Sequence, residues 1–256
     1  MKKQIGFKSL LSLVLLASIL TGCGIDPPGK VVDRGSRLKD LKLNQSQPGA
    51  QNPQQDPNRV LQLVQLVAQA HSRNNSVACD LIAFFRKDDG TTSSMKSKFR
   101  FKKPNQTSME ITEASQGGTV GTKLVWTGGK DVAIKTKLMG FWLKTSLDVN
   151  DSRIADARGY RINQTSLDQM FATFLHAQAK HELMSEGSLK GRPVAVVRVD
   201  SPMKLRGVTH EVFGIYVDNF VPAFRELYNG KTLLMRIQID NARLNPSMES
   251  SAFNLD

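Results

Sequence analysis

The chain has 256 residues and carries 35 Lys and Arg against 23 Asp and Glu, which gives a formal charge of +12. Hydrophobic residues make up 40%, enough for a sizeable core, so wholesale disorder is excluded. Two cysteines exclude a disulfide-rich scaffold and a multi-cysteine metal site, and four histidines leave little for a histidine-rich metal centre.

The first residues have the features of a secretion signal. Lys2 and Lys3 precede an apolar run, 10–20, which is shorter than the roughly 20 residues of a membrane span. Leu20-Thr21-Gly22-Cys23 then resembles the lipobox of bacterial lipoproteins. The resemblance implies a signal peptide over 1–22 and acylation of Cys23 with chains such as palmitate, which anchor a protein at about 0.8 kcal/mol per buried CH₂. The alternative is an ordinary secretory signal with a chance cysteine.

Residues 23–56 are predicted to be the acylated cysteine and a flexible linker. The stretch 44–57 holds five Gln and three Pro and has no apolar face to bury. A short element within 31–43 is the alternative. Gly24 rather than Asp follows the cysteine, and by the enterobacterial sorting rule the lipoprotein reading then implies the outer membrane, facing the periplasm.

The domain, predicted to cover 57–256, begins with a helix. Asp56-Pro57 is a helix start, and apolar residues recur at helical spacing over 60–68, so we expect a helix that ends near 71–75. A second helix is expected where Thr165-Ser166-Leu167-Asp168 resembles a capping box. Its apolar stripe consists of Leu167, Met170, Phe171, Phe174 and Leu175.

Most of the remaining chain alternates with a period of two. About nine strands are expected, at 77–85, 95–102, 108–112, 124–126, 132–137, 183–189, 193–199, 208–217 and 231–240. The fold class is therefore mainly β (α+β), with one curved antiparallel sheet and helices on its concave side. Cys79 lies in the first strand, and with Cys23 acylated it has no partner, so we expect a buried, inert thiol.

Several short motifs occur in the order typical of one superfamily. Phe99-Arg100-Phe101-Lys102-Lys103-Pro104, followed by Ser108-Met109-Glu110-Ile111, resembles a strand pair of the LolA/LolB/RseB-like superfamily. The segment 124–132 resembles its next hairpin, and 241–245 its ending. Leu147-Asp148 with Gly159-Tyr160-Arg161-Ile162 is similar to an uncharacterised lipoprotein-sorting-like branch, although Val149 replaces its proline.

The resemblance covers 57–256 and implies an eleven-stranded half-barrel whose apolar cavity binds acyl chains of lipoproteins or other lipids. Alternation gives inward-facing candidates for the cavity lining. They are Phe99, Phe101, Met109, Ile111, Leu124, Trp126, Ile134, Val197, Phe213, Ile215 and Met235. The same pattern is also typical of a dry, packed core, and the sequence leaves that alternative open.

Two surface features are candidates for lipid contact. Lys96, Lys98, Arg100 and Lys102 share one strand face and form a candidate patch for anionic headgroups or the membrane, with a solvated outer face as the alternative. The run 138–142 is apolar. As part of a strand it belongs to the core or the cavity rim, which we expect, whereas as a turn it exposes an apolar tip.

No pattern indicates catalysis. His176 and His181 are five residues apart, no H-E-x-x-H or G-x-S-x-G occurs, and Asp148, Asp151 and Asp156 fit turns and caps. We therefore expect a non-enzymatic envelope protein without metal or cofactor. Its expected partners are acyl chains or lipoproteins, the membrane through Cys23 and a membrane protein, but no nucleic acid. Alternatives are an RseB-like lipid-sensing interaction protein and a structural lipoprotein without ligand.

Overall fold

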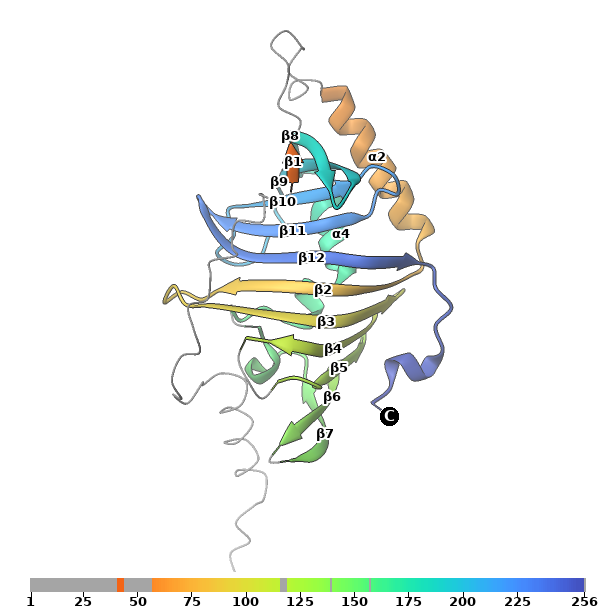
Figure 1. The fold of residues 1–256 in the computed structure, drawn as a ribbon, viewed down its shortest axis with the longest axis vertical. Helices are drawn as coiled ribbons and strands as arrows, with labels where there is room; N and C mark the ends of the chain where they lie inside the picture. The colour runs from red at the N-terminus through yellow and green to blue at the C-terminus, as the bar shows by residue number, and fades with distance from the viewer. Residues whose placement is uncertain (1–40, 44–56, 116–118, 139, 157, 256) are drawn as a thin grey trace, which may run out of the picture.

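The computed structural model describes residues 41–43, 57–115, 119–138, 140–156 and 158–255. The predicted signal peptide, Cys23 and most of the predicted linker lie outside these residues. One antiparallel sheet of twelve strands, ordered β1-β8-β9-β10-β11-β12-β2-β3-β4-β5-β6-β7, organises the chain (Figure 1). The strands are β1 (Leu41–Leu43), β2 (Ser76–Arg86), β3 (Thr92–Lys102), β4 (Gln106–Ala114), β5 (Lys123–Thr127), β6 (Asp131–Leu138), β7 (Phe141–Asp148), β8 (Lys180–Leu189), β9 (Arg192–Asp200), β10 (His210–Tyr216), β11 (Pro222–Asn229) and β12 (Thr232–Leu244).

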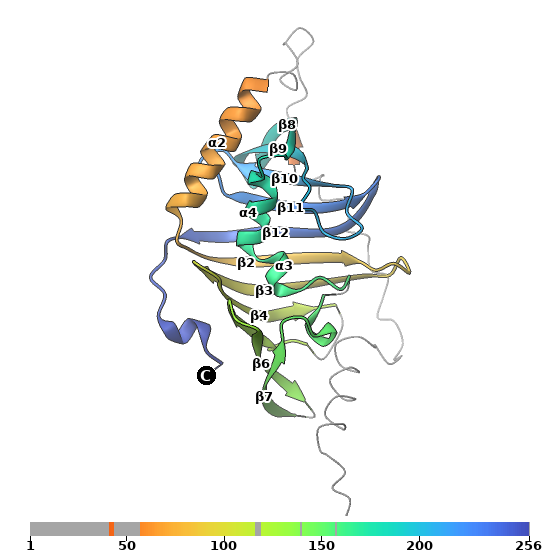
Figure 2. The ribbon, with the colours of Figure 1, turned by 180° about the vertical axis from the view of Figure 1, so that it is seen from behind.

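The helices lie on one face of this curved sheet, as the view from behind shows (Figure 2). They are α2 (Pro57–Arg73), α3 (Ile162–Thr165) and α4 (Leu167–Leu175), with two 3₁₀ turns, η3 (Ser152–Ile154) and η4 (Ser250–Phe253). The predicted fold class, a curved antiparallel sheet with helices on its concave side, is confirmed.

Helix α4 begins one residue later than its sequence motif predicts. Ser166 is the N-cap and its Oγ accepts a hydrogen bond from Gln169 N at 3.3 Å. Thr165 instead ends α3, where its Oγ1 donates to Arg161 O. The expected capping box at Thr165 is therefore wrong, because the preceding helical turn already uses that residue.

The core lies between α4 and the concave face of the sheet. Phe174 of α4 is 1% exposed and packs edge-to-face on Phe213 of β10, with ring centroids 5.1 Å apart. Helix α2 docks beside α4, since His71 stacks on Phe171 at 4.2 Å. Cys79 is buried in the same cluster, and burial raises the pKa of its thiol to about 12, so the predicted buried thiol is confirmed.

Three strands were not among those expected. β11 escapes the period-two pattern because six consecutive residues of it are buried, with apolar or paired side chains on both faces. β7 is an edge strand of the sheet and begins within the apolar run 138–142. β1 interrupts the predicted linker and pairs with β8, with Leu41 opposite Leu189, in agreement with the alternative of a short element in 31–43.

Candidate functional site: an apolar pocket on the concave face

A pocket of about 230 Å³ lies on the part of the concave face that α4 leaves uncovered. Its floor comes from β2, β3, β4, β5, β6 and β12, and its cover consists of described residues of η3, of α3 and of the chain that flanks α3. The floor is apolar because every second side chain of these strands points to this face. Leu81, Phe85 and Met95 belong to it together with several of the predicted residues.

The structure divides the predicted cavity residues into two groups. Six line the pocket: Phe99, Met109, Ile111, Leu124, Ile134 and Met235. Five do not: Phe101, Trp126, Val197, Phe213 and Ile215. Phe101, Val197, Phe213 and Ile215 also face inward but pack in the core with α4, whereas Trp126 packs on Val132 and donates its indole N–H to Gly129 O at 2.8 Å.

Sequence reasoning missed the residues that cover the pocket. Ile154, Tyr160 and Ile162 come from short turns, η3, α3 and the chain before α3, which are too short to show a periodicity. Tyr160 and Ile162 lie in a motif noted for its family resemblance, but that motif did not indicate a place in the pocket. Tyr160 fixes the segment, because its hydroxyl donates to Arg206 O at 2.9 Å. Leu81 and Ile237, by contrast, lie on the same face of the sheet as the predicted residues, so the alternation along β2 and β12 could have identified them.

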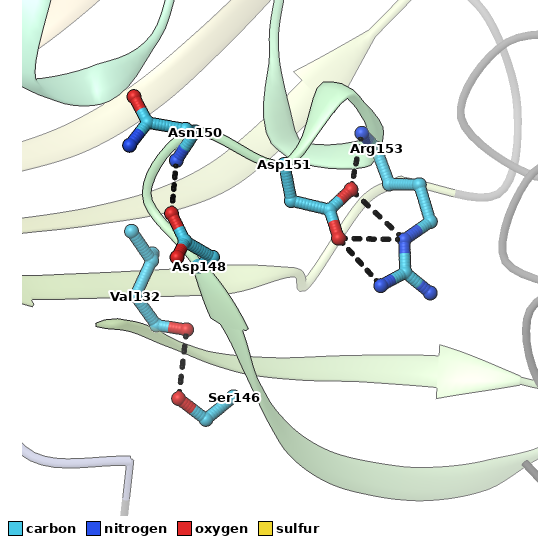
Figure 3. A network of polar contacts seen from close by, with 6 residues as sticks. All are labelled: Val132, Ser146, Asp148, Asn150, Asp151 and Arg153. Atoms are coloured by element: carbon cyan, nitrogen blue, oxygen red, sulfur yellow. Dashed lines mark hydrogen bonds and ion pairs between the residues drawn. The ribbon is translucent and has the colours of Figure 1, made fainter. Parts of the chain in front are cut away.

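A turn at the rim of the pocket is held by carboxylates (Figure 3). Asp151 accepts hydrogen bonds from Arg153 N at 2.9 Å and from the Arg153 guanidinium at 2.5 Å, and these bonds lower the pKa of Asp151. Asp148 accepts from Asn150 N at 2.8 Å, which lowers the pKa of Asp148. The prediction that these two are turn and cap residues is confirmed.

Asp156, a third acidic residue of this segment, is largely buried against the pocket. Its Oδ1 accepts hydrogen bonds from Arg158 N at 2.8 Å and Tyr160 N at 3.0 Å, which closes the turn. Burial nevertheless dominates and raises the pKa of Asp156 from 3.8 to about 6. The folded chain therefore binds more protons than the unfolded chain between these two values, and the free energy of unfolding falls as pH rises through that window.

The substitution Asp156→Asn should flatten this pH dependence, because Asn keeps the Oδ1 acceptor and has no charge. Relative to the parent chain, the variant should gain about 3 kcal/mol between pH 4 and pH 7, from about 1.4 kcal/mol per pKa unit. Urea unfolding of both chains at four pH values measures this. A difference that stays constant across the range would show that Asp156 titrates normally.

The predicted basic patch lies on the convex face, away from the pocket. Lys96, Lys98, Arg100 and Lys102 alternate with inward-facing Phe99 and Phe101. Lys96 Nζ is 2.8 Å from Glu113 Oε2, and Lys98 stands between Asp80 and Glu110 in the register. The face is therefore of mixed charge.

The apolar run 138–142 forms the β6–β7 turn, with Met139 outside the described residues. Leu138 lines the pocket, as expected for a rim residue. Phe141 and Trp142 are 80% and 55% exposed, so their assignment to the core or rim is wrong. The reason is the tight turn at Gly140, with φ 88°, which places both rings at the tip of an edge strand.

The histidines have structural contacts. His181 Nε2 is hydrogen-bonded to Phe174 O at 2.6 Å, and His176 Nδ1 accepts from Gln178 N at 3.1 Å. Among the described residues, no three His, Cys, Asp or Glu side chains gather as a metal site would require. Nor does this part of the chain contain a helix long and apolar enough to cross a membrane.

No family model and no curated protein matches the chain, whereas a search of solved structures finds distant similarities. MucB is 16% identical, with a TM-score of 0.46 over 78% of this chain, which spans 63% of the MucB chain. The Mycobacterium tuberculosis lipoprotein LppX is 11% identical, with a TM-score of 0.46 over 76% of this chain and 99% of its own. A LolA superfamily protein from Nitrosomonas europaea is 11% identical, with a TM-score of 0.35 over 76% of this chain and 97% of its own.

Proposed function

We propose that this chain is a non-enzymatic binder of acyl chains, from lipids or lipoproteins, in the bacterial cell envelope. The observation that carries the proposal is the pocket of about 230 Å³ with a floor of apolar side chains from six strands. Such a pocket replaces the bilayer as the apolar solvent of an acyl chain. Burying about ten methylenes gains on the order of 8 kcal/mol before the costs of association.

The lipobox-like segment around Cys23 supports anchoring to a membrane, with the outer membrane facing the periplasm as the proposed site. Phe141 and Trp142, at the tip of β6–β7, support contact with a bilayer or a protein partner. An anchored chain suits a local acceptor or receptor of lipid better than a carrier that diffuses between membranes.

The experiment is to export residues 24–256, which contain every described residue, behind a cleavable secretory signal and to purify them without detergent. Native mass spectrometry and lipid extraction then show what the pocket holds. We expect an acyl-chain lipid at near-stoichiometric amount, or its uptake on addition. A bare polypeptide mass without uptake would exclude the proposal and favour a structural or protein-binding lipoprotein.

The variant Met109→Glu should bind a fluorescent fatty acid at least 100-fold more weakly, because its carboxylate enters an apolar pocket at a cost of several kcal/mol. Thr112→Glu on the same strand is the control, since Thr112 is exposed and lies outside the pocket lining. Circular dichroism confirms folding of both variants. Parental affinity in a folded Met109→Glu variant would place the ligand elsewhere.

A further inference from the structure

The pocket is apolar along most of its length but polar at one end. β2 and β4 end there, β3 begins there, and β6 ends beside them, because antiparallel neighbours bring these termini to the same side of the sheet (Figure 1). Hydroxyl groups gather at this end, and they belong to Ser93, Ser94, Ser115, Thr119, Thr122 and Thr136. Phe99, Met109 and Leu124 line the inner part.

Four charged residues line the pocket, and two of them are engaged within the protein. The Arg153 guanidinium binds Asp151, and Asp156 accepts the hydrogen bonds of its own turn. The other two, Lys87 and Lys137, lie at the polar end and form no ion pair with any described residue. Lys137, however, alternates along β6 with the inward-facing Thr136 and Leu138, so its side chain points to the convex face.

Lys87 is the better placed of these two lysines. It follows Phe85 by two residues, so it continues the concave face just beyond β2. The turn there is closed by hydrogen bonds from Lys87 N to Thr91 O at 2.8 Å and from Gly90 N to Lys87 O at 3.0 Å. Lys87 is half-buried, whereas Lys137, at the end of β6, is exposed.

We infer that the pocket takes an amphiphile with one acyl chain and an anionic head, a carboxylate or a phosphate, with the head at Lys87. This rests on the proposed function and names the class of ligand. The volume of about 230 Å³ lies below the range of roughly 300–1,000 Å³ for pockets that hold drug-sized ligands, which fits one chain rather than several. The serine and threonine hydroxyls supply further donors to the head.

The test compares palmitate, palmitoyl-lysophosphatidate and the neutral monopalmitoylglycerol as competitors of a fluorescent fatty acid bound to residues 24–256. Both anionic ligands should bind about fivefold more tightly than the neutral one, since one lysine near an anionic lipid head contributes about that factor. The variant Lys87→Gln should abolish this preference. The convex-face control Lys98→Gln, Lys102→Gln should keep it.

The outcomes separate this inference from the function on which it rests. Equal affinity for all three ligands, or loss of the preference in the control as well, overturns the headgroup site and leaves acyl-chain binding intact. Binding of none of the three overturns the proposed function itself. The ratio of palmitate to lysophosphatidate identifies the favoured head, a carboxylate or a phosphate.

Discussion

Replacing Glu211 by Ala should lower the free energy of unfolding by about 3–5 kcal/mol, the usual cost of breaking a buried ion pair. Glu211 of β10 and Arg225 of β11 are 0% and 1% exposed. Arg225 Nε is 2.7 Å from Glu211 Oε2 and Arg225 Nη2 is 2.9 Å from Glu211 Oε1. The substitution would leave a guanidinium charge buried among Phe213, Leu227 and Ile237 without a counter-ion.

The double variant Glu211→Leu, Arg225→Met is the matched control, because it removes both charges and keeps the volume. It should be close to the parent chain in stability, or above it. Urea unfolding followed by circular dichroism measures all three chains. A single variant that loses less than about 1 kcal/mol, or a double variant as unstable as the single one, would show that the charge is not the cause.

Truncating Phe174 to Ala should cost about 3–5 kcal/mol, because it opens a void under α4. The ring of Phe174 lies between Phe213 and His181, with centroids 5.1 and 4.9 Å away. Phe141→Ala is the control, since that ring is 80% exposed and its loss should change stability by no more than about 0.5 kcal/mol. Urea unfolding of the two variants under the same conditions gives the comparison.

The same variant separates the packed core from the pocket. Phe174 does not line the pocket, so a folded Phe174→Ala chain should bind the fluorescent fatty acid within about twofold of the parent. A loss of affinity comparable to that of Met109→Glu would mean that the ligand extends under α4, where Val197, Phe213 and Ile215 lie.

Alternation in the sequence was sufficient to predict most of the sheet. In β3, Phe99 and Phe101 are buried while Lys98 and Lys102 are exposed, and this contrast is legible in the sequence. β11 has no such contrast. Phe224 is buried on its convex face and Arg225 on its concave face, where Glu211 pairs with it. Because the charged residue faces the core and the aromatic residue lies on the convex face, polar and apolar residues do not alternate here as they do in a strand with one wet face.

The position of the pocket could be predicted only in part, because alternation along a strand gives limited information. It identifies the face of the sheet to which a side chain points, and both Met109 and Phe213 face inward as expected. Which part of that face is covered depends on where α4 packs, and this is a property of the tertiary structure. The cover of the pocket, with Ile154 in η3 and Tyr160 before α3, is made of elements too short to show a repeat.

The sheet order has a consequence for how the chain folds. β2 and β12, which lie at opposite ends of the domain's sequence, pair at the middle of the sheet, with Ile237 opposite Ala83. The centre therefore cannot form until the C-terminal strand is available, and such long-range pairing makes folding slow. Until β12 is available, β2 can pair with its sequence neighbour β3 but its other edge stays open. A chain cut before Thr232 would lack the neighbour of β2 and expose that strand to aggregation.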